Sequence, residues 1–212
     1  GLRRRDNVLF VGAEWGEAAL EAASFGCDVT VLCENPQVEK ILTERANEAK
    51  RGRIRLIPGL YRNTGVYDVL ISVSSLPHDN IYDVLPQLVA DDVAPRGRIV
   101  VERPWRGHTR QEMPLSWWRS YIDADSQLRS RSECVAALEA VGAQLTQATH
   151  CGHHYIRSLE LWDESFRAHV AEAGALGYDA VYRRLWRTAL AISRAAVRTG
   201  ALEYQRLVFT KR

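Results

Sequence analysis

Residues Val8–Glu34 read VLFVGAEWGEAALEAASFGCDVTVLCE. An apolar run, a glycine turn, an alanine-rich stretch and a second apolar run follow one another. This order predicts the strand, helix and parallel strand that open a nucleotide-binding α/β sheet. The usual turn of such a sheet spells G-x-G-x-G, whereas Gly12–Gly16 here read GAEWG. Glu14 therefore places a carboxylate where a bare backbone should approach the ligand.

Apolar runs continue to alternate with amphipathic stretches along the chain, which is typical of a parallel sheet with helices on both faces. We predict strands over Asn7–Gly12, Asp28–Cys33, Arg53–Ile57, Tyr67–Val73, Gly97–Glu102, Ala143–His150 and Glu203–Thr210. We predict helices over Glu14–Phe25, Pro36–Lys50 after an Asn35 cap, Asn80–Val93, Ser132–Val141 after a Ser132 cap, Leu159–Ala173 and Tyr178–Arg198. A polar insertion over 103–131 and a helical excursion over about 158–199 complete one domain, 1–212.

The composition is that of an ordinary globular protein, with 46% hydrophobic and 25% charged residues and a formal net charge of +2. We expect no nucleic-acid partner. No apolar run approaches the roughly 20 residues that span a bilayer. Scattered cysteines without a CxxC pair are typical of reduced core residues, so we expect a cytoplasmic location.

The second half carries the more specific motifs. They lie in Trp117–Ser130, Gly152–Trp162, Leu176–Trp186 and Arg198–Gln205. In this order they resemble the cyclopropane-fatty-acyl-phospholipid synthases and mycolic-acid cyclopropane synthases. The resemblance implies a class I methyltransferase fold: a Rossmann-like, seven-stranded, mostly parallel sheet with a helical excursion before the last strand. It also implies S-adenosylmethionine as cofactor and a lipid acyl chain or other hydrophobic substrate.

The family's cofactor turn runs roughly D-I-G-C-G-W-G. Gly12, Trp15 and Gly16 match it, while Glu14 replaces the central glycine. Because the side chain crowds the cofactor and its charge repels the cofactor's carboxylate, we expect S-adenosylmethionine binding to be weakened or lost. The alternative is that Glu14 simply begins the helix, where its charge suits the dipole. Glu34, after the second strand, could accept the ribose hydroxyls or could be a solvated residue.

The resemblance implies a bicarbonate base held by side chains that this sequence has largely replaced. Of the family's phenylalanine-glutamate-histidine stretch only His78 remains, and Glu102 stands where the family has a histidine. Tyr155 and Trp162 match positions that line the acyl-chain pocket, and packing in the core explains them equally well. The resemblance also implies an N-terminal segment that closes over the cofactor in the family, and we expect this protein to lack it.

Two functional interpretations follow. In the first, the chain is a pseudoenzyme that acts beside an active homologous methyltransferase or as a homo-oligomer. In the second, the site is rebuilt: Glu102 accepts the proton, with its pKa raised by apolar walls, and His78 orients it. A purely structural role, in which Glu102 forms an ion pair with Arg103 or Arg106, is favoured over this catalytic role.

Two further clusters bear on metal binding and on membrane contact. His153 and His154 are expected at a strand end, where adjacent side chains point to opposite sides, so we predict no metal site. Arg103, Arg106 and Arg110 lie with Trp105, Trp117 and Trp118 in the insertion. Such a set suits peripheral contact with anionic headgroups. A solvated loop is the commoner explanation.

Overall fold

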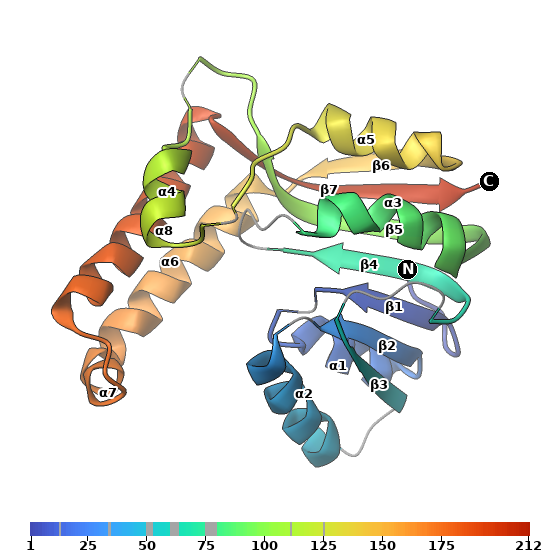
Figure 1. Ribbon diagram of the computed structural model, residues 1–212, viewed down its shortest axis with the longest axis horizontal. Coiled ribbons are helices and arrows are strands. Elements are labelled where there is room, and N and C mark those ends of the chain that lie inside the picture. The colour runs from blue at the N-terminus through green and yellow to red at the C-terminus, as the bar shows by residue number, and fades with distance from the viewer. Residues whose placement is uncertain are drawn as a thin grey trace.

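The computed structural model describes residues 1–12, 14–33, 35–49, 53–59, 64–74, 80–110, 112–124 and 126–212. Within them, one seven-stranded sheet has the order β3-β2-β1-β4-β5-β7-β6 (Figure 1). The strands are β1 (Asn7–Val11), β2 (Asp28–Cys33), β3 (Arg53–Pro58), β4 (Tyr67–Val73), β5 (Val93–Arg106), β6 (Ala143–His150) and β7 (Leu202–Lys211). Strands β1 to β5 are parallel, and β7 is antiparallel to both β5 and β6. The predicted sheet is confirmed.

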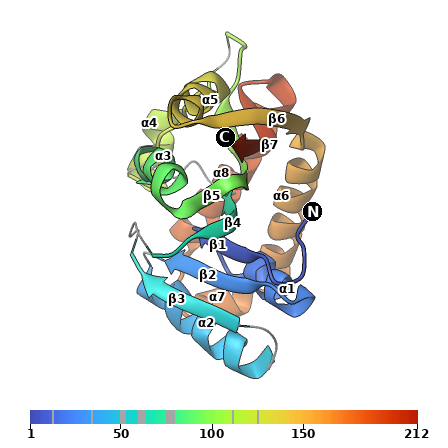
Figure 2. The ribbon, with the colours of Figure 1, turned by 90° about the vertical axis from the view of Figure 1, so that its right-hand side faces the viewer.

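Helices lie on both faces of the sheet. They are α1 (Glu17–Phe25), α2 (Pro36–Ala49), α3 (Asn80–Asp92), α4 (Leu115–Tyr121), α5 (Arg131–Ala140), α6 (Gly152–Ala168), α7 (Val170–Ala175) and α8 (Ala180–Thr199). Figure 2 shows α3 and α5 on one face and α1 on the other. Each face buries its own apolar cluster, one under α3 and α5 and one under α1 and α2.

The last helices project beyond the carboxyl ends of the central strands. In Figure 1 the arrowheads of β1 and β4 point toward α6 and α8. These two helices pack on each other and on α4 through a third buried cluster, which includes Tyr155, Leu159, Leu190 and Trp118. In an α/β sheet of this kind, ligands bind beside the carboxyl ends of the strands. The projecting helices therefore form a wall over the expected ligand position.

The first helix begins later than predicted. We expected it from Glu14, but α1 starts at Glu17, because Gly16 at its N-cap has a left-handed backbone with φ 84°. The interpretation of Glu14 as the first residue of the helix is therefore wrong. At the other end Gly26, also left-handed, closes α1 by donating its backbone N–H to the carbonyls of Ala22 and Ala23. Both glycines adopt a backbone that other residues rarely reach.

Two helix starts differ from the prediction because of local packing and capping. Helix α5 is capped by Ser130 rather than Ser132, in a capping box with Glu133. Helix α6 starts at Gly152, not at Leu159. Tyr155 and Leu159 lie one turn apart on the same helix face and are both buried, which extends the helix toward its N-terminus. It ends at Ala168, and α7 follows as a separate short helix.

The insertion is more ordered and more buried than predicted. Strand β5 continues to Arg106 and pairs there with β7. Trp105 and Trp118 are 0% and 1% exposed, and the Arg103 side chain is buried, with Nη2 donating to Ser72 Oγ at 2.6 Å. These three side chains therefore cannot reach a membrane surface. None of the helices in the described ranges combines the length and the apolar character needed to cross a membrane.

Candidate functional site

The turn after β1 keeps the backbone of a nucleotide-binding loop. Gly12 has φ 69°, Glu14 has φ 47° and Gly16 has φ 84°, so all three are left-handed. Glutamate rarely adopts this conformation, which costs about 1–2 kcal/mol in a residue with a Cβ. The loop therefore holds Glu14 in the geometry that suits a glycine, and its side chain is exposed.

Helix α2 supports this turn. Arg45 Nη1 donates to the Trp15 carbonyl at 2.8 Å, and Arg45 Nη2 pairs with Glu17 at 2.7 Å. Gly16 lies directly against Leu42, since a Cβ added at Gly16 would come within 1.7 Å of Leu42 Cδ2. Gly16, which matches the family's cofactor turn, thus leaves space that Leu42 of α2 occupies.

The turn opens into a cleft with a volume of ≈ 710 Å³. Its lining residues come from the turn, from the ends of β2 and β4 and from helices α2, α6 and α8: Glu14, Trp15, Asn35, Val38, Ser74, Trp162, Ser165, Phe166, His169 and Trp186. The cleft lies where the fold class places its ligands. Glu14 and Trp15 were predicted for it, and Trp162 was matched to a pocket position.

Sequence reasoning missed the other wall residues. Asn35 was predicted only as a helix cap, and it does cap α2, since Gln37 donates its backbone N–H to Asn35 Oδ1 at 2.9 Å. Ser74 follows β4 and lies beside β5, because its backbone N–H donates to the Glu102 carbonyl at 2.9 Å. Phe166, four residues after Trp162, could have been found from the spacing of one helix turn.

Tyr155 is 4% exposed and belongs to the buried cluster that joins α6 to α8. Its ring stacks on Tyr204 with centroids 4.3 Å apart and an interplanar angle of 8°. Burial raises the pKa of its phenol well above the usual range, and the Glu14 charge raises it further, while a hydrogen bond with Ser193 acts in the opposite direction. The phenol therefore stays protonated at neutral pH.

Glu102 is held in an ion pair with Arg206. The two residues face each other across β5 and β7, and Arg206 Nε donates to Glu102 Oε2. This contact raises the pKa of the Arg206 guanidinium. The expected partners were wrong: Arg103 bonds to Ser72, and Arg106 pairs with Glu133 at 3.2 Å. Glu102 is not among the residues that line the cleft.

Two predicted site residues, Glu34 and His78, lie outside the described residues. His153 and His154 are not at a strand end but in the first turn of α6, with ring centroids 3.9 Å apart. Their expected opposite orientation was therefore wrong. Across the described ranges, no three histidine, cysteine or acidic side chains gather as metal ligands would.

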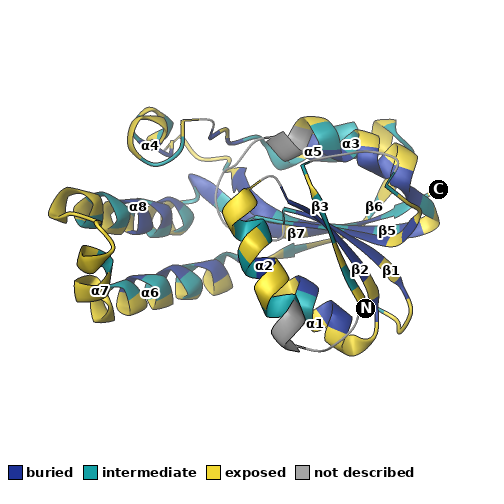
Figure 3. Ribbon diagram, turned by 60° about the horizontal axis from the view of Figure 1, so that its bottom comes forward, coloured by how far each residue is buried: buried dark blue, intermediate teal, exposed yellow. Residues whose placement is uncertain are grey.

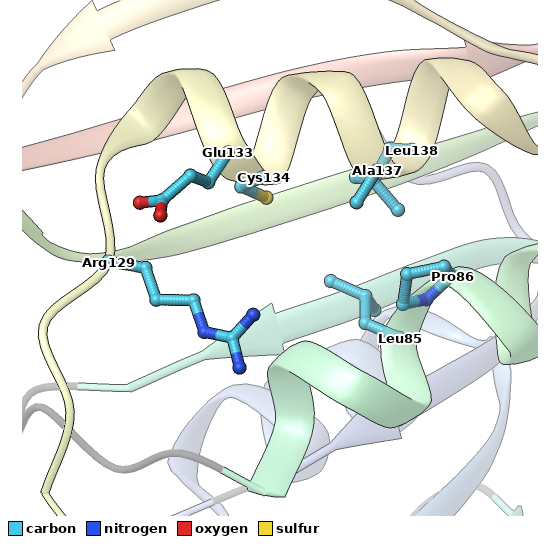
Figure 4. A pocket seen from close by; sticks show the side chains of 7 residues that line it. All are labelled: Leu85, Pro86, Arg129, Glu133, Cys134, Ala137 and Leu138. Atoms are coloured by element: carbon cyan, nitrogen blue, oxygen red, sulfur yellow. The ribbon is translucent and has the colours of Figure 1, made fainter.

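A small hollow elsewhere in the molecule is too small for a cofactor or substrate. It lies between α3 and α5 and has a volume of ≈ 20 Å³, about enough for a single water molecule. Figure 4 shows Arg129 and Glu133 at one end and Leu85, Pro86 and Leu138 at the other. Among the residues that the structure describes, it shares no lining residue with the cleft.

A buried carboxylate ties together the two helices that wall the cleft. Asp163 on α6 is 3% exposed and accepts from Arg167 of the same helix and from Arg187 of α8, the latter at 3.1 Å. Arg194 of α8 is 4.0 Å away. The hydrogen bond from Arg167, followed by that from Arg187, holds the pKa of Asp163 below its usual range.

Asp163→Asn is expected to lower the free energy of unfolding at pH 7 by about 2 kcal/mol, because hydrogen bonds to a charged group are lost. The folded pKa of Asp163 lies below the unfolded value of about 3.9. Its contribution is therefore full above that pH and is lost as the pH falls through the folded pKa. Urea unfolding at pH 7 and pH 3 measures this: the variant should differ from wild type less at pH 3 than at pH 7, because pH 3 lies below the unfolded pKa.

Glu172→Gln on exposed α7 is the control and should change stability little at either pH. A loss in Asp163→Asn that is equally large at pH 3 and pH 7 would contradict the ionic origin of the effect.

The comparisons with known proteins agree with this fold. The family model of mycolic acid cyclopropane synthetase matches residues 1–207. Tuberculostearic acid methyltransferase UfaA1 of Mycobacterium tuberculosis is 26% identical over 215 residues, which cover 96% of this chain and 49% of UfaA1. Cyclopropane mycolic acid synthase MmaA2 of the same species is 26% identical over 206 residues, covering 87% of this chain and 70% of MmaA2. The chain thus spans about half the length of UfaA1.

Solved structures show the same architecture. The cyclopropane synthase MmaA2 from M. tuberculosis superposes with a TM-score of 0.88 at 20% identity, covering 100% of this chain and 80% of that chain. The mycolic acid cyclopropane synthase CmaA1, complexed with SAH and CTAB, gives a TM-score of 0.88 at 19% identity with the same coverage.

Proposed function

This chain belongs to the mycolic acid cyclopropane synthetase family, and on that premise we propose that it is a pseudoenzyme-like subunit of lipid acyl-chain modification. In this proposal its cleft is the site of S-adenosylmethionine, which it binds weakly. Methyl transfer then depends on a partner, either an active homologous methyltransferase or a second copy. The observation that carries the proposal is Glu14, at φ 47° in the turn and in the wall of the cleft.

The residues of the cleft fit the cofactor only in part. The left-handed backbones of Gly12 and Gly16 keep the shape of the loop. At the position between them, however, a Cβ and a carboxylate fill space that the family leaves to a glycine, and like charges a few ångströms apart repel. Glu102, the replacement for a family histidine, is engaged by Arg206. This supports impaired chemistry when the chain acts alone.

The alternative is an active C-methyltransferase or cyclase with a rebuilt site. One observation favours it: the cleft remains open, at ≈ 710 Å³, with aromatic side chains from the turn and from both wall helices. In that reading Glu102 accepts a proton directly from the substrate. The ion pair between Arg206 and Glu102 would first have to open.

A transfer assay separates the two readings. The purified chain is mixed with methyl-labelled S-adenosylmethionine and vesicles of an unsaturated phospholipid, and label in the lipid is counted. We expect no incorporation above a blank without protein, and more incorporation by an active homologue mixed with the chain than by the same amount of homologue alone. Turnover by the chain alone that Glu102→Gln abolishes, while Glu133→Gln does not, would overturn the proposal in favour of the rebuilt site.

A further inference from the structure

Exposed apolar side chains concentrate at one end of the molecule. We call residues 166–187 the helical tip; it comprises the end of α6, all of α7 and the start of α8. It holds half of the ten large hydrophobic side chains that are exposed in the described residues: Val170, Leu176, Tyr178, Val181 and Tyr182. Leu176 is 78% exposed. Such side chains are normal when scattered, but a contiguous group of them marks an interaction surface.

The helical tip is also basic. It contains four arginines against two carboxylates, Glu172 and Asp179. Asp179 is already engaged, since it caps α8 by accepting from the Tyr182 backbone N–H at 2.8 Å. All four arginines line a cavity of ≈ 360 Å³ together with Phe166, Val170 and Ala180: Arg167, Arg183, Arg184 and Arg187.

The four arginines differ in whether they already have hydrogen-bond partners within the protein. Arg167 and Arg187 bond to Asp163, and Arg183 Nη1 donates to the Tyr178 carbonyl at 3.0 Å. Arg184 has no such contact within the described part of the chain and is exposed. It is therefore the arginine with the most freedom to meet an external anion.

We propose that the helical tip is a docking surface for an anionic lipid bilayer. Leu176, Val181 and the paired rings of Tyr178 and Tyr182, whose centroids are 4.6 Å apart, enter the interface. The arginines contact lipid phosphates, for which the guanidinium fork is well suited. Segments that anchor proteins in a membrane interface combine apolar and basic side chains in the same way.

The shape of the helical tip favours a bilayer over an acidic protein. Figures 1 and 3 show α7 at the far end of the projecting helices, away from the sheet. A stable protein interface buries about 800 Å² on each partner, usually over a broad surface. A narrow projection suits shallow insertion between headgroups better.

Docking at the helical tip would also place the cleft beside the lipid. Phe166 lines both the arginine cavity and the cleft, and His169 and Val170 lie on either side of the boundary between them. An acyl chain from the bilayer would have a short path to the cleft. The inference thus deepens the proposed role in lipid modification, but bilayer binding requires neither cofactor nor turnover and is tested separately.

Vesicle co-sedimentation tests the proposal. The full chain is mixed with phosphatidylglycerol vesicles or phosphatidylcholine vesicles at low salt, without cofactor. We expect binding to the anionic vesicles that weakens with salt and survives millimolar inorganic phosphate. Arg184→Glu should weaken it by about tenfold or more, because each basic residue near an anionic surface contributes measurably. Leu176→Asp should weaken it at least several-fold.

Matched controls sit elsewhere on the surface. Val66→Asp changes a side chain that is 66% exposed near β4, and Arg110→Glu changes an exposed arginine of the insertion. Both should bind like wild type, and circular dichroism checks that every variant is folded. No sedimentation of the wild-type chain, equal binding by the tip variants, or loss only in Arg110→Glu would overturn the proposal. Full displacement by free phosphate would instead identify a soluble phosphate site and also overturn it.

Discussion

Gly16→Ala is expected to lower the free energy of unfolding by about 3 kcal/mol, since overpacking of a core costs about 1–3 kcal/mol and a left-handed backbone about 1–2 kcal/mol. The new Cβ would come within 1.7 Å of Leu42 Cδ2, and Leu42 is only 2% exposed, so its side chain has little room to move away. Urea unfolding followed by circular dichroism measures the change.

Gly177→Ala is the matched control for this substitution. Gly177 also has a left-handed backbone, with φ 93°, but a Cβ there would meet nothing within 4 Å. It should lose only the backbone contribution, about 1–2 kcal/mol. Gly16→Ala should cost less stability when it is made in a Leu42→Ala background than when it is made in the wild-type chain, because the shorter side chain leaves room for the new Cβ. Equal losses at Gly16 and Gly177 would show that contact with α2 is not what demands the glycine.

Glu14→Gly is expected to raise the affinity for S-adenosylmethionine by about tenfold or more. Two unit charges of the same sign about 4 Å apart repel by about 1–4 kcal/mol between water and the protein surface, and each 1.4 kcal/mol is a factor of about ten in affinity. The glycine also reopens the space that the side chain fills. Because φ is 47° at this position, the substitution should not destabilise the fold. Isothermal calorimetry measures the affinity.

Two controls separate charge from bulk. Glu14→Gln removes the charge but keeps the size of the side chain, so an intermediate affinity identifies repulsion as one contribution. Glu21→Gln removes an exposed carboxylate of α1, seven residues further on, which does not line the cleft. It should leave the affinity unchanged. An equal gain in Glu21→Gln would mean that net charge, rather than the position of Glu14, governs binding.

Much of the fold could be predicted because the sequence carries local, periodic signals. The bounds of β2, β4 and β6 agree with the prediction to the residue. The errors arose where tertiary contacts decide. Helix α1 starts late because its N-cap is Gly16, which has a left-handed backbone and packs so closely against Leu42 of α2 that no Cβ fits. Strand β5 runs on to Arg106 because β7 returns from 96 residues away to pair with it.

The candidate site was only partly predictable. The glycine turn identified Glu14 and Trp15 because such a turn has a fixed place beside β1. The partner of Glu102 was not foreseen, because Arg206 is adjacent only through an antiparallel strand pairing that no local pattern encodes. The arginines of the insertion form a charged cluster in the sequence, whereas burial of Arg103 beside Ser72 depends on the packing of β5 under α3 and α5.

The most direct test of the central claim is a crystal structure of the wild-type chain soaked with S-adenosylhomocysteine, beside one of Glu14→Gly soaked in the same way. We predict ligand density next to Trp15 in the variant and none in the wild-type cleft at the same concentration. Well-ordered ligand in the wild-type cleft, with its carboxylate accommodated beside Glu14, would contradict the claim that this side chain spoils the site.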